Sequence, residues 1–205
     1  TILAEILFEY SDDSDIQQER QGLQAIMHGT GELSLQKMAQ TKIIMHLGQA
    51  IDAQSKGQDE MAADELGQAL LSGFEHPALY FSLGMLRAEG DRADNAISHL
   101  RHAVKHAEFG LAARLLLGRS LRTLGRLSEA ATDYLEALKL ADTMMVSEEQ
   151  AGALRQLYEP LIEALSGEGD EEKHERLCDN IDEMLMRDDW REHLQTARDE
   201  LPKSD

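Results

Sequence analysis

The strongest constraint on the fold of this chain is a spacing of 34 residues that recurs along its middle half. Three sets of residues repeat with this period, and the pair Leu83-Gly84 returns as Leu117-Gly118. The three sets are Ala62, Ala96 and Ala130; Leu66, Leu100 and Tyr134; and Ala69, Ala103 and Ala137. A fixed period of this length is typical of proteins that stack one supersecondary unit repeatedly.

Each unit of this period contains two apolar stretches with helical spacing, separated by a glycine. These glycines are Gly57, Gly90 and Gly125, and a glycine between periodic segments marks a turn. No segment alternates β-branched with polar residues, so the sequence predicts helices and no strands. We expect each unit to be a helical hairpin whose helices cross where small residues allow close approach. The predicted crossings place Ala50, Gly84 and Gly118 against Ala62, Ala96 and Ala130.

These residues resemble the tetratricopeptide repeat (TPR) family, whose pattern includes Leu-Gly, a turn Gly, Ala, a large apolar residue and a second Ala. The third unit matches best, through Leu117-Gly118, Gly125, Ala130, Tyr134 and Ala137, while Arg114, Leu121 and Asp142 replace the family's Trp, Tyr and Pro. The resemblance implies an all-α fold, a right-handed superhelical array of antiparallel helix pairs (a TPR-like α-solenoid) with N- and C-terminal capping helices. The alternative is a run of amphipathic helices whose phase is coincidental.

The predicted organisation has three parts. Residues 1–42 form N-terminal capping helices, residues 43–144 form three tandem repeats, and residues 145–205 form a divergent fourth hairpin and a terminal capping helix. The repeats span 43–76, 77–110 and 111–144. Residues 1–10 either belong to the cap or occupy a groove, which is that of the array itself or that of a neighbouring molecule.

Two helix starts are predicted beside the repeat pattern. The first helix of the first repeat can begin as early as Ser34. Ser147 with Gln150 predicts a capping box at the start of a later helix, and Pro160 should kink that helix.

In TPR proteins the first helix of each hairpin lines a concave groove that usually receives an extended peptide or a helix. The resemblance carries this partner-binding role to a mostly apolar set of residues: Ile44, Leu47, Ile51, Gln54, Phe81, Ser82, Met85, Leu115, Arg119 and Arg122. Arg119 and Arg122 form a basic spot suited to a carboxylate of the ligand. The Lys and Asn clamp with which chaperone-binding members hold a C-terminal carboxylate is absent, so we expect no binding of that kind.

The formal net charge of −19 is distributed unevenly. Residues 1–76 and 145–205 carry net charges of −9 and −11, and residues 77–144 carry +1. An acidic surface repels phosphate backbones and anionic lipid, so we expect no nucleic-acid or membrane partner. Cys178 is the only cysteine, which excludes an internal disulfide and favours a cytoplasmic location.

The sequence predicts neither a catalytic residue nor a cofactor, because no phosphate-binding glycine loop, His-Glu-x-x-His or nucleophile elbow is present. His99, His102 and His106 are expected on one helix face, but no carboxylate or thiol completes a metal site at an obvious spacing. The leading hypothesis is a protein–protein interaction scaffold or adaptor that is a monomer or weak homodimer. The alternatives are a regulatory module of a larger signalling protein that responds to a peptide or small effector, and a metal-binding protein.

Overall fold

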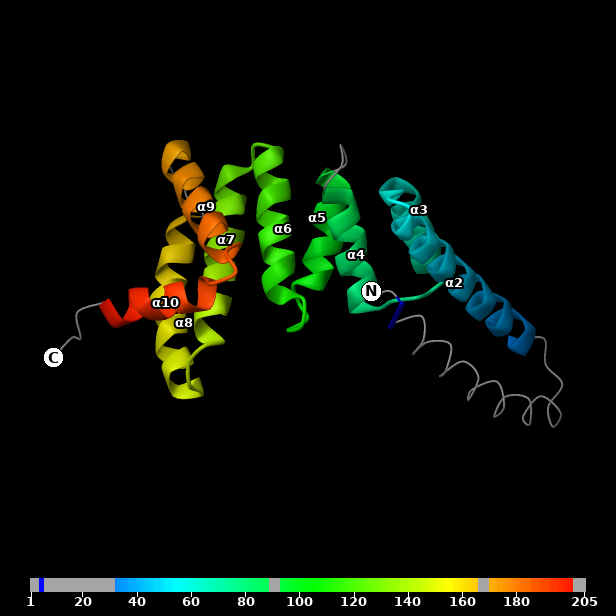
Figure 1. The fold of residues 1–205 in the computed structure, drawn as a ribbon, viewed down its shortest axis with the longest axis horizontal. Coiled ribbons are helices and arrows are strands. Elements are labelled where there is room, and N and C mark those ends of the chain that lie inside the picture. Colours follow the sequence, from blue (N-terminus) through cyan, green and yellow to red (C-terminus); the bar gives the residue numbers. More distant parts are fainter. Residues whose placement is uncertain (1–3, 6–31, 89–92, 166–169, 201–205) are drawn as a thin grey trace. The chain divides into compact units, whose positions relative to one another are not determined.

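Within residues 4–5, 32–88, 93–165 and 170–200, which the computed structural model describes, the chain forms nine α-helices and no strand. The predicted all-α class is therefore confirmed for this part of the chain. Figure 1 labels the helices α2 to α10 and colours them along the sequence, from blue to red. The chain divides into two compact units, Thr1–Arg92 and Ala93–Asp205.

The first unit contains the helices α2 (Glu32–Ser55), α3 (Asp59–Leu71) and α4 (Pro77–Ala88). Helix α3 packs against both α2 and α4. Apolar residues three and four positions apart turn one stripe of each helix inwards, so Leu47 on α2 and Leu66 on α3 are fully buried. A hydrogen bond between His46 Nδ1 and Glu65 Oε2, 2.7 Å apart, links α2 to α3 at the edge of this core.

The second unit contains the helices α5 (Ala93–Ala103), α6 (Gly110–Thr123), α7 (Leu127–Thr143), α8 (Glu148–Leu165), α9 (Glu171–Leu185) and α10 (Trp190–Glu200). Helix α7 is its centre, because α7 packs against α6, α8 and α9. Helix α5 packs against α6, and α10 against α9.

Two of the predicted turn glycines lie between helices and have a left-handed backbone. Gly57 separates α2 from α3 with φ of 67°, and Gly125 separates α6 from α7 with φ of 72°. Residues with a Cβ rarely adopt this conformation, which explains why glycine stands at both turns. The third predicted turn glycine, Gly90, lies outside the described residues.

The contact between α6 and α7 brings Gly118 against an aromatic ring. A Cβ added to Gly118 would lie 2.7 Å from Cε2 of Tyr134, and its three nearest neighbours would all be Tyr134 ring atoms. The sequence pattern predicts Ala130 as the partner of Gly118. That pairing stays a prediction, and the missing side chain of Gly118 leaves room for the fully buried ring of Tyr134.

The residues that recur every 34 positions share one property in the fold. Each of the nine has a relative exposure of 0%; they are Ala62, Ala96, Ala130, Leu66, Leu100, Tyr134, Ala69, Ala103 and Ala137. The positions selected from the sequence period are therefore core positions.

The predicted division into a cap, three repeats and a C-terminal part stays a prediction. Helix α2 begins at Glu32, close to the predicted early start at Ser34, and continues across the proposed boundary between 42 and 43. The division between the two compact units, after Arg92, falls inside the predicted second repeat. Residues 1–10, with the exception of 4–5, lie outside the described residues.

The predicted capping box at the start of α8 is confirmed. The backbone amide of Ser147 donates to Oε1 of Gln150 at 3.3 Å, and the backbone amide of Gln150 donates to Oγ of Ser147 at 3.5 Å. These reciprocal bonds satisfy amide groups that the first turn of a helix leaves without an intrahelical acceptor. Helix α8 continues through Pro160 to Leu165.

Candidate interaction surface

The two arginines of the predicted basic spot on α6 are ion-paired with α9. Arg119 donates from Nε to Oδ1 of Asp182 at 3.0 Å and from Nη2 to Oδ2 at 3.1 Å, which is a two-pronged guanidinium–carboxylate pair. Arg122 donates from Nη2 to Oδ1 of Asp179 at 2.6 Å. The chain's own helix therefore supplies the carboxylates that the sequence analysis assigned to a ligand.

The ion pairs of α6 and α9 lie beside an apolar interior. Burial raises the pKa of the Tyr134 hydroxyl to about 12, and the nearby guanidinium groups of Arg119 and Arg122 partly offset this effect. Burial likewise raises the pKa of the Cys178 thiol to about 11. Both groups are uncharged at neutral pH, so they act as packing residues beneath the charged pairs.

Sequence reasoning missed Asp179 and Asp182, although one signal pointed to them. The two aspartates are three residues apart on α9, as the two arginines are on α6, and the pairs form in reverse order along the two helices. Residues three apart lie on one face of a helix, so the two spacings match. This signal is weak by itself, because acidic residues at helical spacing are frequent throughout the chain.

The remaining predicted partner-binding residues fall into two groups by exposure. Leu47, Ser82 and Leu115 are buried, with relative exposures of 0%, 4% and 8%. These three side chains offer almost no surface to a partner. They pack inside the protein instead. The half-buried group, all in the first unit, consists of Ile44, Ile51, Gln54, Phe81 and Met85.

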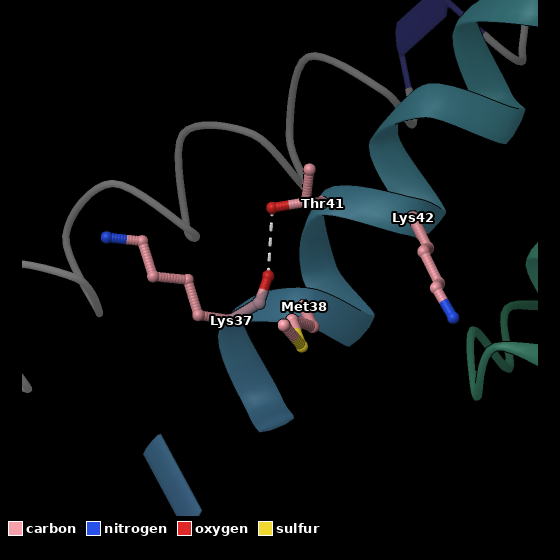
Figure 2. A pocket seen from close by; sticks show the side chains of 4 residues that line it. All are labelled: Lys37, Met38, Thr41 and Lys42. Atoms are coloured by element: carbon pink, nitrogen blue, oxygen red, sulfur yellow. Dashed lines mark hydrogen bonds between the residues drawn. The ribbon is translucent and has the colours of Figure 1, made fainter. Parts of the chain in front are cut away.

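An open hollow lies on the N-terminal half of α2, lined by Lys37, Met38, Thr41 and Lys42. Figure 2 shows that the amino groups of the two lysines point away from one another. The hydroxyl of Thr41 donates to the backbone oxygen of Lys37 at 2.9 Å. The four side chains therefore do not converge on a common ligand atom, and this hollow is not the interaction surface predicted from the sequence.

The histidine face expected in the second predicted repeat does not form as predicted. Helix α5 ends at Ala103, so His106 lies beyond the helix that carries His99 and His102. The backbone turns there, and the amide of His106 donates to the oxygen of Ala103 at 3.0 Å. Among the residues that the structure describes, no group of three or more His, Cys, Asp or Glu side chains is arranged to hold a metal ion.

None of the described helices combines the length and the hydropathy that crossing a lipid bilayer requires. The chain matches no protein-family model, no curated protein and no solved structure. The TPR resemblance thus rests on the residues that carry it, and stays a prediction.

Proposed function

We propose that this chain is a protein-interaction module of the TPR type, in which antiparallel helix pairs form a right-handed superhelical array that binds a partner peptide or helix. One observation carries the proposal. All nine residues that recur every 34 positions are fully buried, so the period of the sequence coincides with the period of the core. Tandem repeats of one helical hairpin would put the same positions of each unit in the core, which supports the proposal.

Side chains of the first unit supply the proposed partner contacts. Phe81 and Met85 lie one turn apart on α4, and Ile44 and Ile51 lie two turns apart on α2; all four are half-buried. Partly exposed aromatic and methionine side chains are common anchors at protein interfaces, because they bury much apolar area on binding. The buried Leu47, by contrast, can act only through the packing of α2.

The partner is expected to be apolar at its contact with this surface. The basic spot of α6 is neutralised by α9, so it does not favour an acidic ligand. An amphipathic helix or an apolar extended peptide fits better than a peptide with a free acidic C-terminus.

A selection from a random peptide library on the full chain tests the proposal. Selected peptides are titrated against the wild type, against Met85→Asp, and against the control Met61→Asp on α3. Met61 is 54% exposed and lies on a helix that the TPR resemblance assigns to the outer layer. Circular dichroism of each variant checks that the fold is intact.

Met85→Asp should weaken the selected peptides by at least about tenfold, because a carboxylate cannot be desolvated against an apolar peptide without a large cost. Met61→Asp should change their affinity less than about twofold, as expected of a residue outside the contact. Equal losses in both variants, or no selected peptide at all, would argue against the proposal.

A further inference from the structure

Helix α8 is the least buried of the longer helices in the second unit. Ala151 is its only buried residue. Two hydrogen bonds tie its inner face to α7, since Tyr158 donates its hydroxyl proton to Oδ2 of Asp142 at 3.2 Å and Ser128 donates to the backbone oxygen of Leu165 at 2.5 Å. Because α8 buries only Ala151, much of its apolar surface lies outside the core.

The exposed apolar residues of α8 form one continuous stripe. Leu157 is 60% exposed and Leu161 is 51% exposed. Ala153, Pro160 and Ala164 are also exposed. These positions lie three or four residues apart, so they follow one side of the helix over about three turns. The two leucines lie about one turn apart, so together with their apolar neighbours they form a contiguous apolar patch, which is more typical of an interaction site than a single exposed leucine is.

Carboxylates line one edge of this apolar stripe. Glu149 and Glu163 are both exposed, and at 100° per residue they lie about 20° and about 60° beyond Pro160 on the same side of the stripe. The single basic residue of α8, Arg155, is engaged by Glu148, with 2.9 Å between Nη1 and Oε1. The stripe therefore combines exposed leucines with a row of negative charge.

We propose that this face of α8 docks an amphipathic helix of a partner protein that carries leucine-like residues along one stripe and Lys or Arg along its edge. A helix fits because the exposed leucines have the spacing at which two helices interlock. The basic edge follows from charge complementarity with the glutamate row, which also guides the register of docking. A second copy of this chain is a poorer occupant, because its own α8 would bring a second acidic row to the contact.

This surface is separate from the half-buried residues of α2 and α4 in the first unit. Peptide selection on the first unit can fail while α8 still docks its partner, and the reverse also holds. The two proposals therefore stand on different residues and different experiments.

The test uses two designed peptides and the full chain. Each peptide has roughly 20 residues, long enough to form a helix, with leucines at the two core positions of a heptad repeat. One peptide carries Lys at the flanking positions, and the other carries Glu there. Binding of each fluorescently labelled peptide is measured by anisotropy.

The wild type should bind the Lys peptide at least about tenfold more tightly than the Glu peptide. The double variant Leu157→Gln with Leu161→Gln keeps every carboxylate and should lose at least about tenfold in affinity for the Lys peptide. The matched control Leu71→Gln removes an 80% exposed leucine on α3 and should leave the affinity unchanged. Circular dichroism should show all of these variants folded, because the changed side chains are exposed.

A charge exchange provides a second readout. The variant Glu149→Lys with Glu163→Lys should lower the affinity for the Lys peptide and raise the affinity for the Glu peptide. The control Glu175→Lys, at an exposed position of α9, should not reverse this preference. Reversal by the α8 variant alone locates the contact on this helix.

Two outcomes would overturn the proposal. If the leucine variant binds the Lys peptide as tightly as the wild type does, the binding is a general attraction to an acidic chain. If the peptides do not bind and sedimentation equilibrium shows a wild-type dimer that the leucine variant dissociates, the stripe is covered by a second copy.

Discussion

Replacing Gly118 by Ala should destabilise the second unit, although Ala is the better helix former. The added Cβ would lie 2.7 Å, 2.8 Å and 3.2 Å from Cε2, Cδ2 and Cζ of Tyr134. Carbon atoms normally approach to about 3.5–4.0 Å, so the ring or the helix must move by roughly 0.8 Å. Tyr134 has a relative exposure of 0%, which leaves its ring no solvent into which it can withdraw.

The two opposing effects can be compared in size. Overpacking a core by one methyl group costs about 1–3 kcal/mol, and exchanging Gly for Ala inside a helix gains about 1 kcal/mol. We expect the free energy of unfolding of Gly118→Ala to fall by the difference between these effects, roughly 0–2 kcal/mol. Urea denaturation followed by tryptophan fluorescence measures this change, because Trp190, the only tryptophan, belongs to the second unit.

A matched control and a second variant make the reasoning refutable. Gly152 lies inside α8, and a Cβ added there meets no atom within 4 Å, so Gly152→Ala should stabilise the unit. In a Tyr134→Leu background the clash is gone, and Gly118→Ala should then be neutral or stabilising. If Gly118→Ala costs the same free energy in both backgrounds, or is stabilising in the wild type, the close contact between α6 and α7 is not what selects glycine.

Three further predictions concern the second unit. Burial raises the pKa of Asp133 to about 6, against the opposing attraction of Arg114. The folded form therefore binds a proton between about pH 4 and 6 that the unfolded form does not, and stability falls as pH rises through this window. When the pH is lowered from 7 to 5, the unfolding free energy of the wild type should rise by about 1 kcal/mol more than that of Asp133→Asn, as measured by urea denaturation. Equal rises in the two proteins would show that Asp133 is not the source of the pH dependence. Cys178 is fully buried, and burial raises its pKa to about 11. At pH 8 a disulfide reagent should therefore modify Cys178 on the order of a hundredfold more slowly than a free thiol. When urea unfolds the protein, the same reagent should modify Cys178 rapidly. Tyr158→Phe removes the hydrogen bond to Asp142 and should lower the free energy of unfolding of this unit by about 1 kcal/mol. Thermal denaturation detects this change as a lower melting temperature.

The sequence predicts the core more completely than it predicts the surface. A residue such as Leu100 or Ala137 is recognised because core positions recur with a fixed period, and burial follows from that period alone. Gly57 and Gly125 are recognised for a similarly local reason, since a left-handed turn between two helices favours glycine. These properties depend on a few neighbouring residues, so a pattern in the sequence is sufficient to locate them.

The candidate interaction surface depends on contacts that no local pattern records. Leu47 and Arg119 are both groove positions in the TPR resemblance, yet one is buried and the other is ion-paired with α9. What decides between these outcomes is how other helices pack, and α9 lies outside the repeat pattern. The partner of Arg119, Asp182, is 63 residues further along the chain, and the chain offers many other acidic residues at similar spacing.

The acidic character of residues 145–205 has different consequences on different helices. On α9, Asp179 and Asp182 neutralise two arginines of α6, and so contribute to the packing of the second unit. On α8, Glu149 and Glu163 lie beside the apolar stripe and neutralise no cation among the described residues. A carboxylate row that only kept the protein soluble would not need an apolar stripe beside it, because exposed leucines reduce solubility. The combination is better explained by a partner helix that covers the leucines and supplies the missing positive charge.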